Sequence, residues 1–140
     1  MTDSPAGMAA WIIEKFRSWS GWGDNFEQLF SKDMLITNVM MYWITNFFCS
    51  AIRIYSESYY NPWELQPGQH IEVPTAIAAY PDEIVPIVRK RAEKYYNVVR
   101  FTEFPKGGHF AIYERAEEMA RDLREFLRLL RKKGKTRMES

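Results

Sequence analysis

The sequence predicts an α/β fold that is mostly helical, and three patterns in its 140 residues indicate it. Residues 72–79 and 98–104 are short apolar runs rich in branched and aromatic side chains, which is typical of buried strands. Residues 83–95 and 114–132, which follow these runs, repeat apolar side chains at helical spacing. Residues 1–60 contain helical patterns and no strand-like run. Strands joined through a helix are parallel, so we expect one βαβα unit with two parallel strands.

The N-terminal half is expected to consist of helices. Ser4 followed by Pro5 is a favourable helix start, because serine caps the helix N-terminus and proline suits its first turn. The expected helices cover residues 5–19, 31–43 and 45–57, with a loop or short turn at 24–29. A stretch rich in turn residues follows, so we expect two regions, residues 1–68 and 69–140.

Composition and charge exclude several classes of protein. The chain is 46% hydrophobic and 16% aromatic, which is typical of a globular domain with a core. Its formal net charge of +1 provides no overall field that would attract nucleic acid. Basic residues between Arg124 and Arg137 suit a helix C-terminus, where cations are favourable, so we expect no nucleic-acid partner.

Cys49 is the single cysteine, which excludes an internal disulfide and fits a reducing, cytoplasmic compartment. It lies in an apolar run, so we expect its thiol to be buried. The run from Met34 to Ile52 contains no charged residue and is long enough to cross a membrane as a helix. Because polar residues such as Asn38 and Asn46 are spread through it, we expect buried helices there rather than a membrane span. Glu14 and Lys15 interrupt the apolar residues near the N-terminus, so we expect no signal peptide.

His109 lies on a glycine loop between the second strand-like run and the last helix, where an imidazole could serve as a general base. A loop histidine satisfied by water is an equally good interpretation. Asp82 and Glu83 follow the first strand-like run, and catalytic groups in α/β sheets gather beyond the carboxyl ends of the strands. Acids at a helix N-terminus also stabilise the helix by about 0.3–1 kcal/mol, which needs no catalysis. We expect no cofactor and no metal.

Five segments in order resemble the C-terminal part of a microsomal-type epoxide hydrolase, an α/β-hydrolase, across nearly the whole chain. They are Asp3–Ala10 with Glu14–Phe16, Leu35–Trp43, Arg53–Tyr55, Val73–Thr75 leading to Tyr80–Glu83, and Gly107–Phe110. The resemblance implies the C-terminal portion of an α/β-hydrolase fold. In that fold, residues 1–68 would form a helical lid, and residues 69–140 would form the last βαβα part of the core.

The resemblance also implies a two-step reaction, in which an aspartate opens the epoxide to form an alkyl-enzyme ester and a histidine-activated water hydrolyses it. His109 would be the water-activating base, and Glu83, two residues after Pro81, would be its orienting acid in preference to Asp82. Tyr55 would donate a hydrogen bond to the epoxide oxygen; an ordinary lid aromatic is the alternative. The substrate would be a small-molecule epoxide, hydrolysed to a vicinal diol.

The family's nucleophile aspartate, on a strand-to-helix turn upstream of the lid, has no counterpart in the sequence. Gly21–Asp24 superficially resembles such a turn, but no buried strand precedes it. We therefore expect a truncated or split hydrolase that is inactive alone and that pairs with a complementing N-terminal chain or self-associates. The alternative is a non-catalytic interaction module, in which the sheet edge and the lid pair with another chain, because two parallel strands leave edges unpaired.

Overall fold

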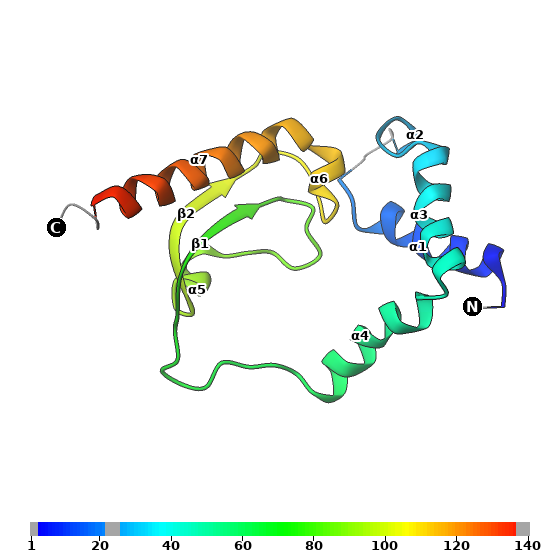
Figure 1. Cartoon of the computed structure of the whole chain (residues 1–140), viewed down its shortest axis with the longest axis horizontal. Helices are drawn as coiled ribbons and strands as arrows, with labels where there is room; N and C mark the ends of the chain where they lie inside the picture. The colour runs from blue at the N-terminus through cyan, green and yellow to red at the C-terminus, as the bar shows by residue number, and fades with distance from the viewer. Residues whose placement is uncertain (1–2, 22–25, 137–140) are drawn as a thin grey trace. The chain divides into compact units, whose positions relative to one another are not determined.

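The computed structural model describes residues 3–21 and 26–136, with side chains up to residue 132. The chain divides into two compact units. The helical unit comprises Met1–Ser18 and Trp22–Gln66, and the α/β unit comprises Trp19–Gly21 and Pro67–Ser140. The described elements, labelled in Figure 1, are α1 (Pro5–Ser18), α2 (Phe26–Leu29), α3 (Lys32–Thr45), α4 (Phe48–Tyr60), β1 (Ile71–Ala79), α5 (Arg89–Ala92), β2 (Tyr96–Glu103), α6 (Ala111–Glu114) and α7 (Ala116–Thr136).

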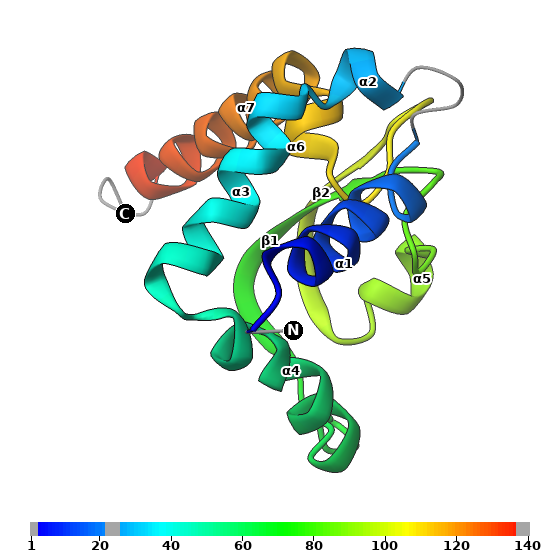
Figure 2. The same ribbon diagram turned by 90° about the vertical axis from the view of Figure 1, so that its right-hand side faces the viewer.

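In the helical unit, α1 begins where the serine–proline pair predicts. The Ser4 hydroxyl accepts a hydrogen bond from the Gly7 N–H at 3.1 Å. Met8, Ile12 and Phe16 are buried at four-residue intervals on one face of α1. Helices α1 and α3, both drawn in Figure 2, pack against each other, and the Phe16 ring meets the Phe30 ring with centroids 5.2 Å apart. The apolar spacing of α1 therefore has packing partners within its own unit.

The uncharged apolar run from Met34 to Ile52 lies in two helices, α3 and α4. Ser31 caps α3 by accepting from the Met34 N–H at 3.2 Å, and Asn46 ends it with a left-handed φ of 55°. No single helix in the described part of the chain is long and apolar enough to cross a membrane. Helices α3 and α4 pass that test only as a pair, and their axes are bent by 94° at the break between them.

The expectation that these two helices are buried was wrong for most of their side chains. Leu35, Val39 and Phe48 are buried, but Ile44 is 73% exposed. Cys49 is exposed too, which corrects the expected buried thiol. The reason is helical geometry: each helix places one face against its neighbours, and Cys49 follows Phe48, whose ring takes the inward position.

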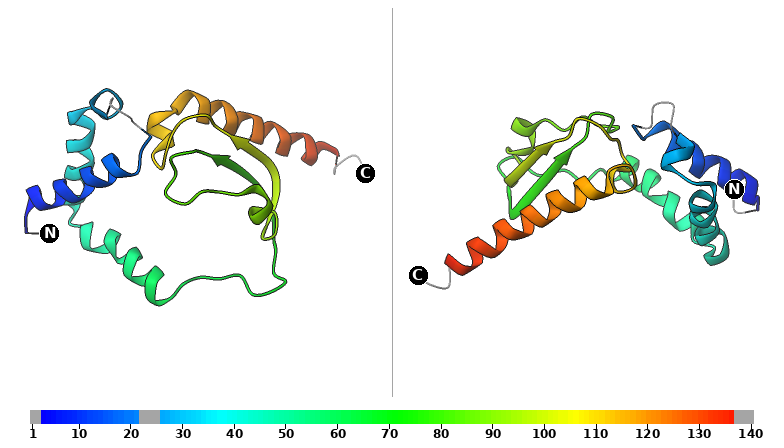
Figure 3. Two further views of the ribbon diagram at one scale, coloured as in Figure 1. Left: turned by 180° about the vertical axis from the view of Figure 1, so that it is seen from behind. Right: turned by 90° about the horizontal axis from the view of Figure 1, so that it is seen from above.

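The α/β unit contains a two-stranded sheet among the described residues, and β1 and β2 are parallel as predicted. Their register runs from Ile71 opposite Tyr96 to Ala79 opposite Glu103, with an irregularity around Thr75. Pro74 precedes Thr75 and has no N–H to donate to the ladder. Figures 1 and 3 show α7 lying along this sheet.

The prediction of a helix over residues 83–95 was largely wrong. Within this range the structure contains a single helical turn, α5 (Arg89–Ala92). Pro86 lies inside the apolar pattern, and proline both lacks an N–H and disfavours helical backbone in the residue before it. Residues 83–88 therefore form an irregular connection. Ile84 and Val85 in this connection are 48% and 71% exposed.

Candidate functional site

The histidine loop, residues 104–110, connects β2 to α6 and has a conformation that glycine permits. Gly107 has a φ of +117°, and a Cβ at this position would lie 2.8 Å from the Tyr80 ring. A Cβ at Gly108 would lie 2.7 Å from the Trp19 carbonyl oxygen. Gly107 therefore permits the positive φ, and Gly108 permits the close approach of the two backbones. Together they set the position of the next residue, His109.

The acidic residues after β1 lie beside this loop. The Asp82 N–H donates to the Gly107 carbonyl at 3.0 Å, and Asp82 and Gly108 form a parallel bridge. The bridge extends the β1–β2 pairing past the ends of the strands. It brings the residue after Asp82 level with the residue after Gly108, so Glu83 and His109 become neighbours although 26 residues separate them.

His109 and Glu83 are in direct contact, with His109 Nδ1 2.8 Å from Glu83 Oε1. An ionised carboxylate can only accept, so this hydrogen bond assigns the proton of the neutral ring to Nδ1 and leaves Nε2 as an acceptor. Glu83 Oε1 also accepts from the Ile84 N–H at 2.8 Å, which orients the carboxylate. An imidazole held in this tautomer can take a proton from water at Nε2.

The structure distinguishes between the two adjacent acids. The Asp82 carboxylate points to Gly21, where a Cβ would lie 2.2 Å from Asp82 Oδ2. Glu83, and not Asp82, is the acid in contact with the His109 ring. Neighbouring side chains on extended backbone point to opposite sides, which explains why one of the pair faces the histidine.

Two groups beside His109 carry no sequence motif and were missed. Trp19 contacts the His109 ring edge-on, with ring centroids 5.3 Å apart, and its carbonyl accepts from the His109 N–H at 2.8 Å. Glu114 is a buried carboxylate that accepts from the Gly21 N–H at 2.9 Å and the Gly108 N–H at 3.0 Å. The sequence offered one signal for Glu114: it is an acidic residue five positions after the histidine, and it ends the short helix α6.

Tyr55 lies on α4 in the helical unit, and half of its surface is exposed. Trp11 of α1 meets the Tyr55 ring edge-on with centroids 5.8 Å apart, and Trp11 meets Phe48 in the same way at 5.5 Å. Aromatic packing within the unit therefore holds the Tyr55 ring. Asp24, considered above as a nucleophile, lies outside the described residues.

Among the residues that the structure describes, no three His, Cys, Asp or Glu side chains are grouped closely enough to hold a metal ion. Tyr80, which precedes the acidic pair, is buried, and its ring stacks on Phe104 with centroids 4.6 Å apart. Burial raises the pKa of the Tyr80 phenol, and the nearby carboxylate of Glu118 adds to this effect.

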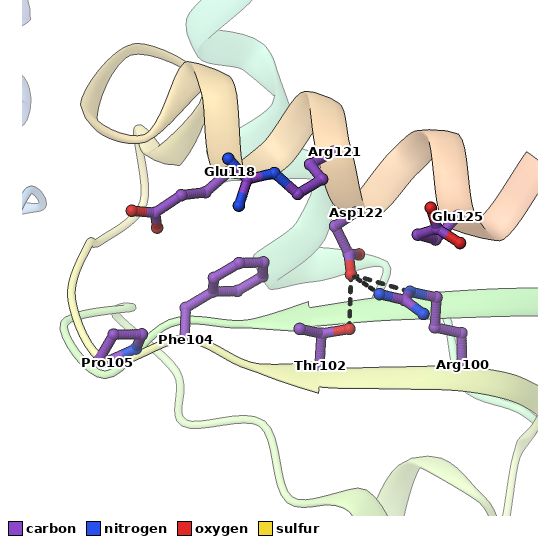
Figure 4. A pocket seen from close by; sticks show the side chains of 8 residues that line it. All are labelled: Arg100, Thr102, Phe104, Pro105, Glu118, Arg121, Asp122 and Glu125. Carbon is purple, nitrogen blue, oxygen red and sulfur yellow. Dashed lines mark hydrogen bonds and ion pairs between the residues drawn. The ribbon is translucent and has the colours of Figure 1, made fainter.

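A separate hollow of about 340 Å³ lies between β2 and α7, and neither His109 nor Glu83 lines it (Figure 4). Its polar centre is Asp122, which is buried and accepts from Arg100 Nε at 2.8 Å and from Thr102 Oγ1 at 2.6 Å. The sequence pattern predicts an apolar face for this helix and did not indicate the ion pair. The dashed lines in Figure 4 show that it joins the helix to the second strand.

Comparisons with known proteins agree on one group of enzymes. No family model matches the chain. Epoxide hydrolase 1 of the rabbit, Oryctolagus cuniculus, is 37% identical, in a match that covers 93% of this chain and 30% of that protein. The chain spans about 30% of the length of the curated relatives it matches.

Solved structures give the same result. The crystal structure of juvenile hormone epoxide hydrolase from the silkworm Bombyx mori matches with a TM-score of 0.79 and 31% identity, over 94% of this chain and 35% of that one. Aspergillus niger epoxide hydrolase matches with a TM-score of 0.71 and 27% identity, over 91% and 31%. These matches confirm the resemblance that the five sequence segments indicated.

Proposed function

Since this chain belongs to the epoxide hydrolases of the α/β-hydrolase superfamily, we propose that it supplies the water-activating part of an epoxide hydrolase. The observation that carries the proposal is the 2.8 Å contact between His109 Nδ1 and Glu83 Oε1. Both residues lie in segments that carry the family resemblance, Tyr80–Glu83 and Gly107–Phe110, which supports the proposal. The substrate is a small-molecule epoxide, and the product is a vicinal diol.

In the proposed reaction, His109 acts on the second of two steps. Glu83 accepts the Nδ1 proton and stabilises the imidazolium that forms when Nε2 removes a proton from water. The resulting hydroxide attacks the carbonyl carbon of an alkyl-enzyme ester, the ester C–O bond breaks, and the imidazolium returns its proton to the departing alkoxide. The carboxylic acid that remains releases its proton to solvent, which balances the proton taken up by the alkoxide of the first step, so the enzyme carboxylate is regenerated and the diol leaves.

Tyr55 acts on the first step in this proposal, as part of a helical lid. Its hydroxyl donates a hydrogen bond to the epoxide oxygen while the ring opens and negative charge develops on that oxygen. Support comes from the Arg53–Tyr55 segment of the family resemblance and from the edge-on contact with Trp11, which restricts the tyrosine ring.

The nucleophile aspartate comes from outside these 140 residues in our proposal, either from a longer protein or from a complementing chain. The match to about 30% of each relative's length supports this, because the other parts of those enzymes have no counterpart here. Without an ester to hydrolyse, activated water has no target, so we expect the isolated chain to produce no diol.

Fragment complementation tests the proposal. The N-terminal part of the silkworm enzyme, ending where its match to this chain begins, is co-expressed with the chain, and diol formation is measured over a panel of epoxides. We expect activity with the parent chain and none with His109→Gln; His70→Gln, the other histidine, is the matched control and should remain active. Diol formation by the chain alone that His109→Gln abolishes would show that the nucleophile is within it.

The second candidate function is a non-catalytic interaction module, which the exposed apolar side chains of the helical unit favour. Ile44, Tyr59 and Trp63 are each at least 70% exposed. An apolar surface of this kind is typical of a protein that is partly covered by another. A complex that forms with the N-terminal part but hydrolyses no epoxide in the panel would favour this function.

A further inference from the structure

Glu114 is a buried carboxylate that the proposed reaction does not use. It is 7% exposed, and its Oε2 atom accepts two backbone hydrogen bonds, from Gly108 in the histidine loop and from Gly21. Its Oε1 atom is buried and has no hydrogen-bond partner among the described residues. Burying a carboxylate is costly, and charge-assisted bonds to N–H groups are the compensation found here.

These two bonds belong to a closed set of contacts around His109, which we call the Glu114 clamp. Its members are Glu114, the Trp19–Gly21 segment and the Gly108–His109 peptide. Trp19 completes the set, because its carbonyl accepts from the His109 N–H at 2.8 Å and its ring packs edge-on against the imidazole. Segments 87 or more residues apart in sequence therefore fix the backbone on which the histidine stands.

The clamp also depends on the absence of a side chain at residue 108. A Cβ there would lie 2.7 Å from the Trp19 carbonyl oxygen, 2.8 Å from the Gly21 nitrogen and 2.9 Å from Ser20 Cα. The two backbones are thus in direct contact, and Glu114 bonds to both. The hydrogen bonds of Glu114 go to main-chain N–H groups and not to the imidazole, so its effect on the ring passes through the backbone.

We propose that Glu114 is a positioning residue: by binding the Gly21 and Gly108 N–H groups, it aims the His109 imidazole so that Nδ1 faces Glu83. The contribution of Glu114 to catalysis rests on the proposed function, whereas its effect on the orientation of the His109 ring does not. A carboxylate serves this role because a single oxygen accepts from two N–H donors that come from different parts of the chain.

The test uses the full 140-residue chain and nuclear magnetic resonance. The averaged nitrogen shifts of a neutral imidazole report which ring nitrogen carries the proton. The chain has two histidines, so His70, whose Nδ1 lies 3.2 Å from Glu72, is an internal control. Deuterium exchange of single amides is measured in the same samples. The variants are Glu114→Leu, Glu114→Gln and, as a matched exposed acid, Glu117→Gln.

In Glu114→Leu we expect the Gly21 and Gly108 amides to exchange about tenfold faster or more, since each loses a bond to a charged acceptor. The His109 ring should lose its preference for the Nδ1 proton while His70 is unchanged. The amides of Asp82 and Phe104, which donate to Gly107 and Ala79, should keep their protection. Glu114→Gln retains one accepting oxygen, so it should restore the His109 tautomer and part of the amide protection. Glu117→Gln should change nothing.

Two results would overturn the proposal. One is a Glu114→Leu chain whose His109 ring signals match those of the parent. The other is faster exchange at Phe104 as well as at Gly108, which would mean a general loss of stability. If the leucine variant does not fold, Glu114→Gln decides, and exchange at Gly21 and Gly108 equal to the parent would refute the clamp. None of these measurements needs catalysis, so failed complementation would leave this result unaffected.

Discussion

The helical unit and the α/β unit are held together internally by different kinds of contact. In the helical unit the buried contacts are apolar and aromatic, such as Phe16 against Phe30 and Trp11 against Phe48. In the α/β unit, buried carboxylates tie distant segments together: Glu114 joins the histidine loop to Gly21, and Asp122 joins α7 to β2. Apolar contacts tolerate small shifts, whereas hydrogen bonds constrain direction, so the second unit is suited to holding an imidazole at a fixed angle.

The largest expected effect comes from changing one side chain of each unit in the complemented enzyme. His109→Ala should slow ester hydrolysis about 10²–10⁴-fold, so the covalent adduct accumulates. Tyr55→Phe should slow ester formation about 10²–10³-fold, so no adduct builds up. Intact-mass measurement after mixing with an epoxide separates the two. A His109→Ala enzyme that binds substrate without forming an adduct would show that the division of steps between the units is wrong.

A core truncation tests whether the helical unit depends on ring packing. Phe30 is 1% exposed, and Phe30→Ala should lower the free energy of unfolding by about 3–5 kcal/mol, because the lost ring leaves a cavity. Urea unfolding measures the change. Phe47→Ala is the control, since Phe47 is 65% exposed, and its effect should stay below about 0.5 kcal/mol. Equal effects of the two variants would contradict the packing of this unit.

The corresponding change in the α/β unit removes a polar anchor. Asp122→Ala leaves Arg100 and Thr102 without their shared acceptor. It should lower the free energy of unfolding by about 3 kcal/mol, the lower end for breaking a buried pair, because the Arg100 side chain is 27% exposed. Glu125→Ala, on the same helix, removes an exposed pair with Arg128 and should cost less than about 1 kcal/mol. If Asp122→Ala lowers the free energy of unfolding as little as Glu125→Ala does, the contacts of Asp122 do not stabilise the α/β unit.

The smallest expected effect is a gain in stability. The Tyr80 hydroxyl is buried and has no hydrogen-bond partner among the described residues, so Tyr80→Phe should raise the free energy of unfolding by about 1 kcal/mol. Burial raises the pKa of this phenol above its ordinary value of 10.0. Above about pH 10 the unfolded chain loses the phenolic proton first, so the folded chain loses stability as the pH rises.

The advantage of Tyr80→Phe over the parent should therefore grow above about pH 10 and stay constant below it. Urea unfolding at several pH values measures it. Tyr60→Phe, at a residue that is 75% exposed, is the matched control and should behave like the parent. An advantage that does not change with pH would mean that the phenol titrates alike in both states.

Local patterns in the sequence determined most of the secondary structure. The cap predicted at Ser4 forms its hydrogen bond, and Ser31, at the start of the helix predicted over residues 31–43, caps α3 in the same way. An N-cap involves only the following turn, so it can be predicted locally. The two strands and their parallel pairing also follow from local runs and the order of elements. The helix predicted over residues 83–95 is the exception, because Pro86 within the apolar pattern prevents a continuous helix there.

The sequence by itself also placed a histidine and an acid at the ends of consecutive strands, and the family resemblance preferred Glu83 to Asp82. Only the tertiary structure decided the burial of α3 and α4, the partners of Asp122 and the Glu114 clamp. These features depend on contacts between segments far apart in the chain, and no spacing rule reports such contacts. A buried carboxylate with backbone N–H partners looks in the sequence like any surface acid, because its partners are main-chain groups that every residue except proline carries.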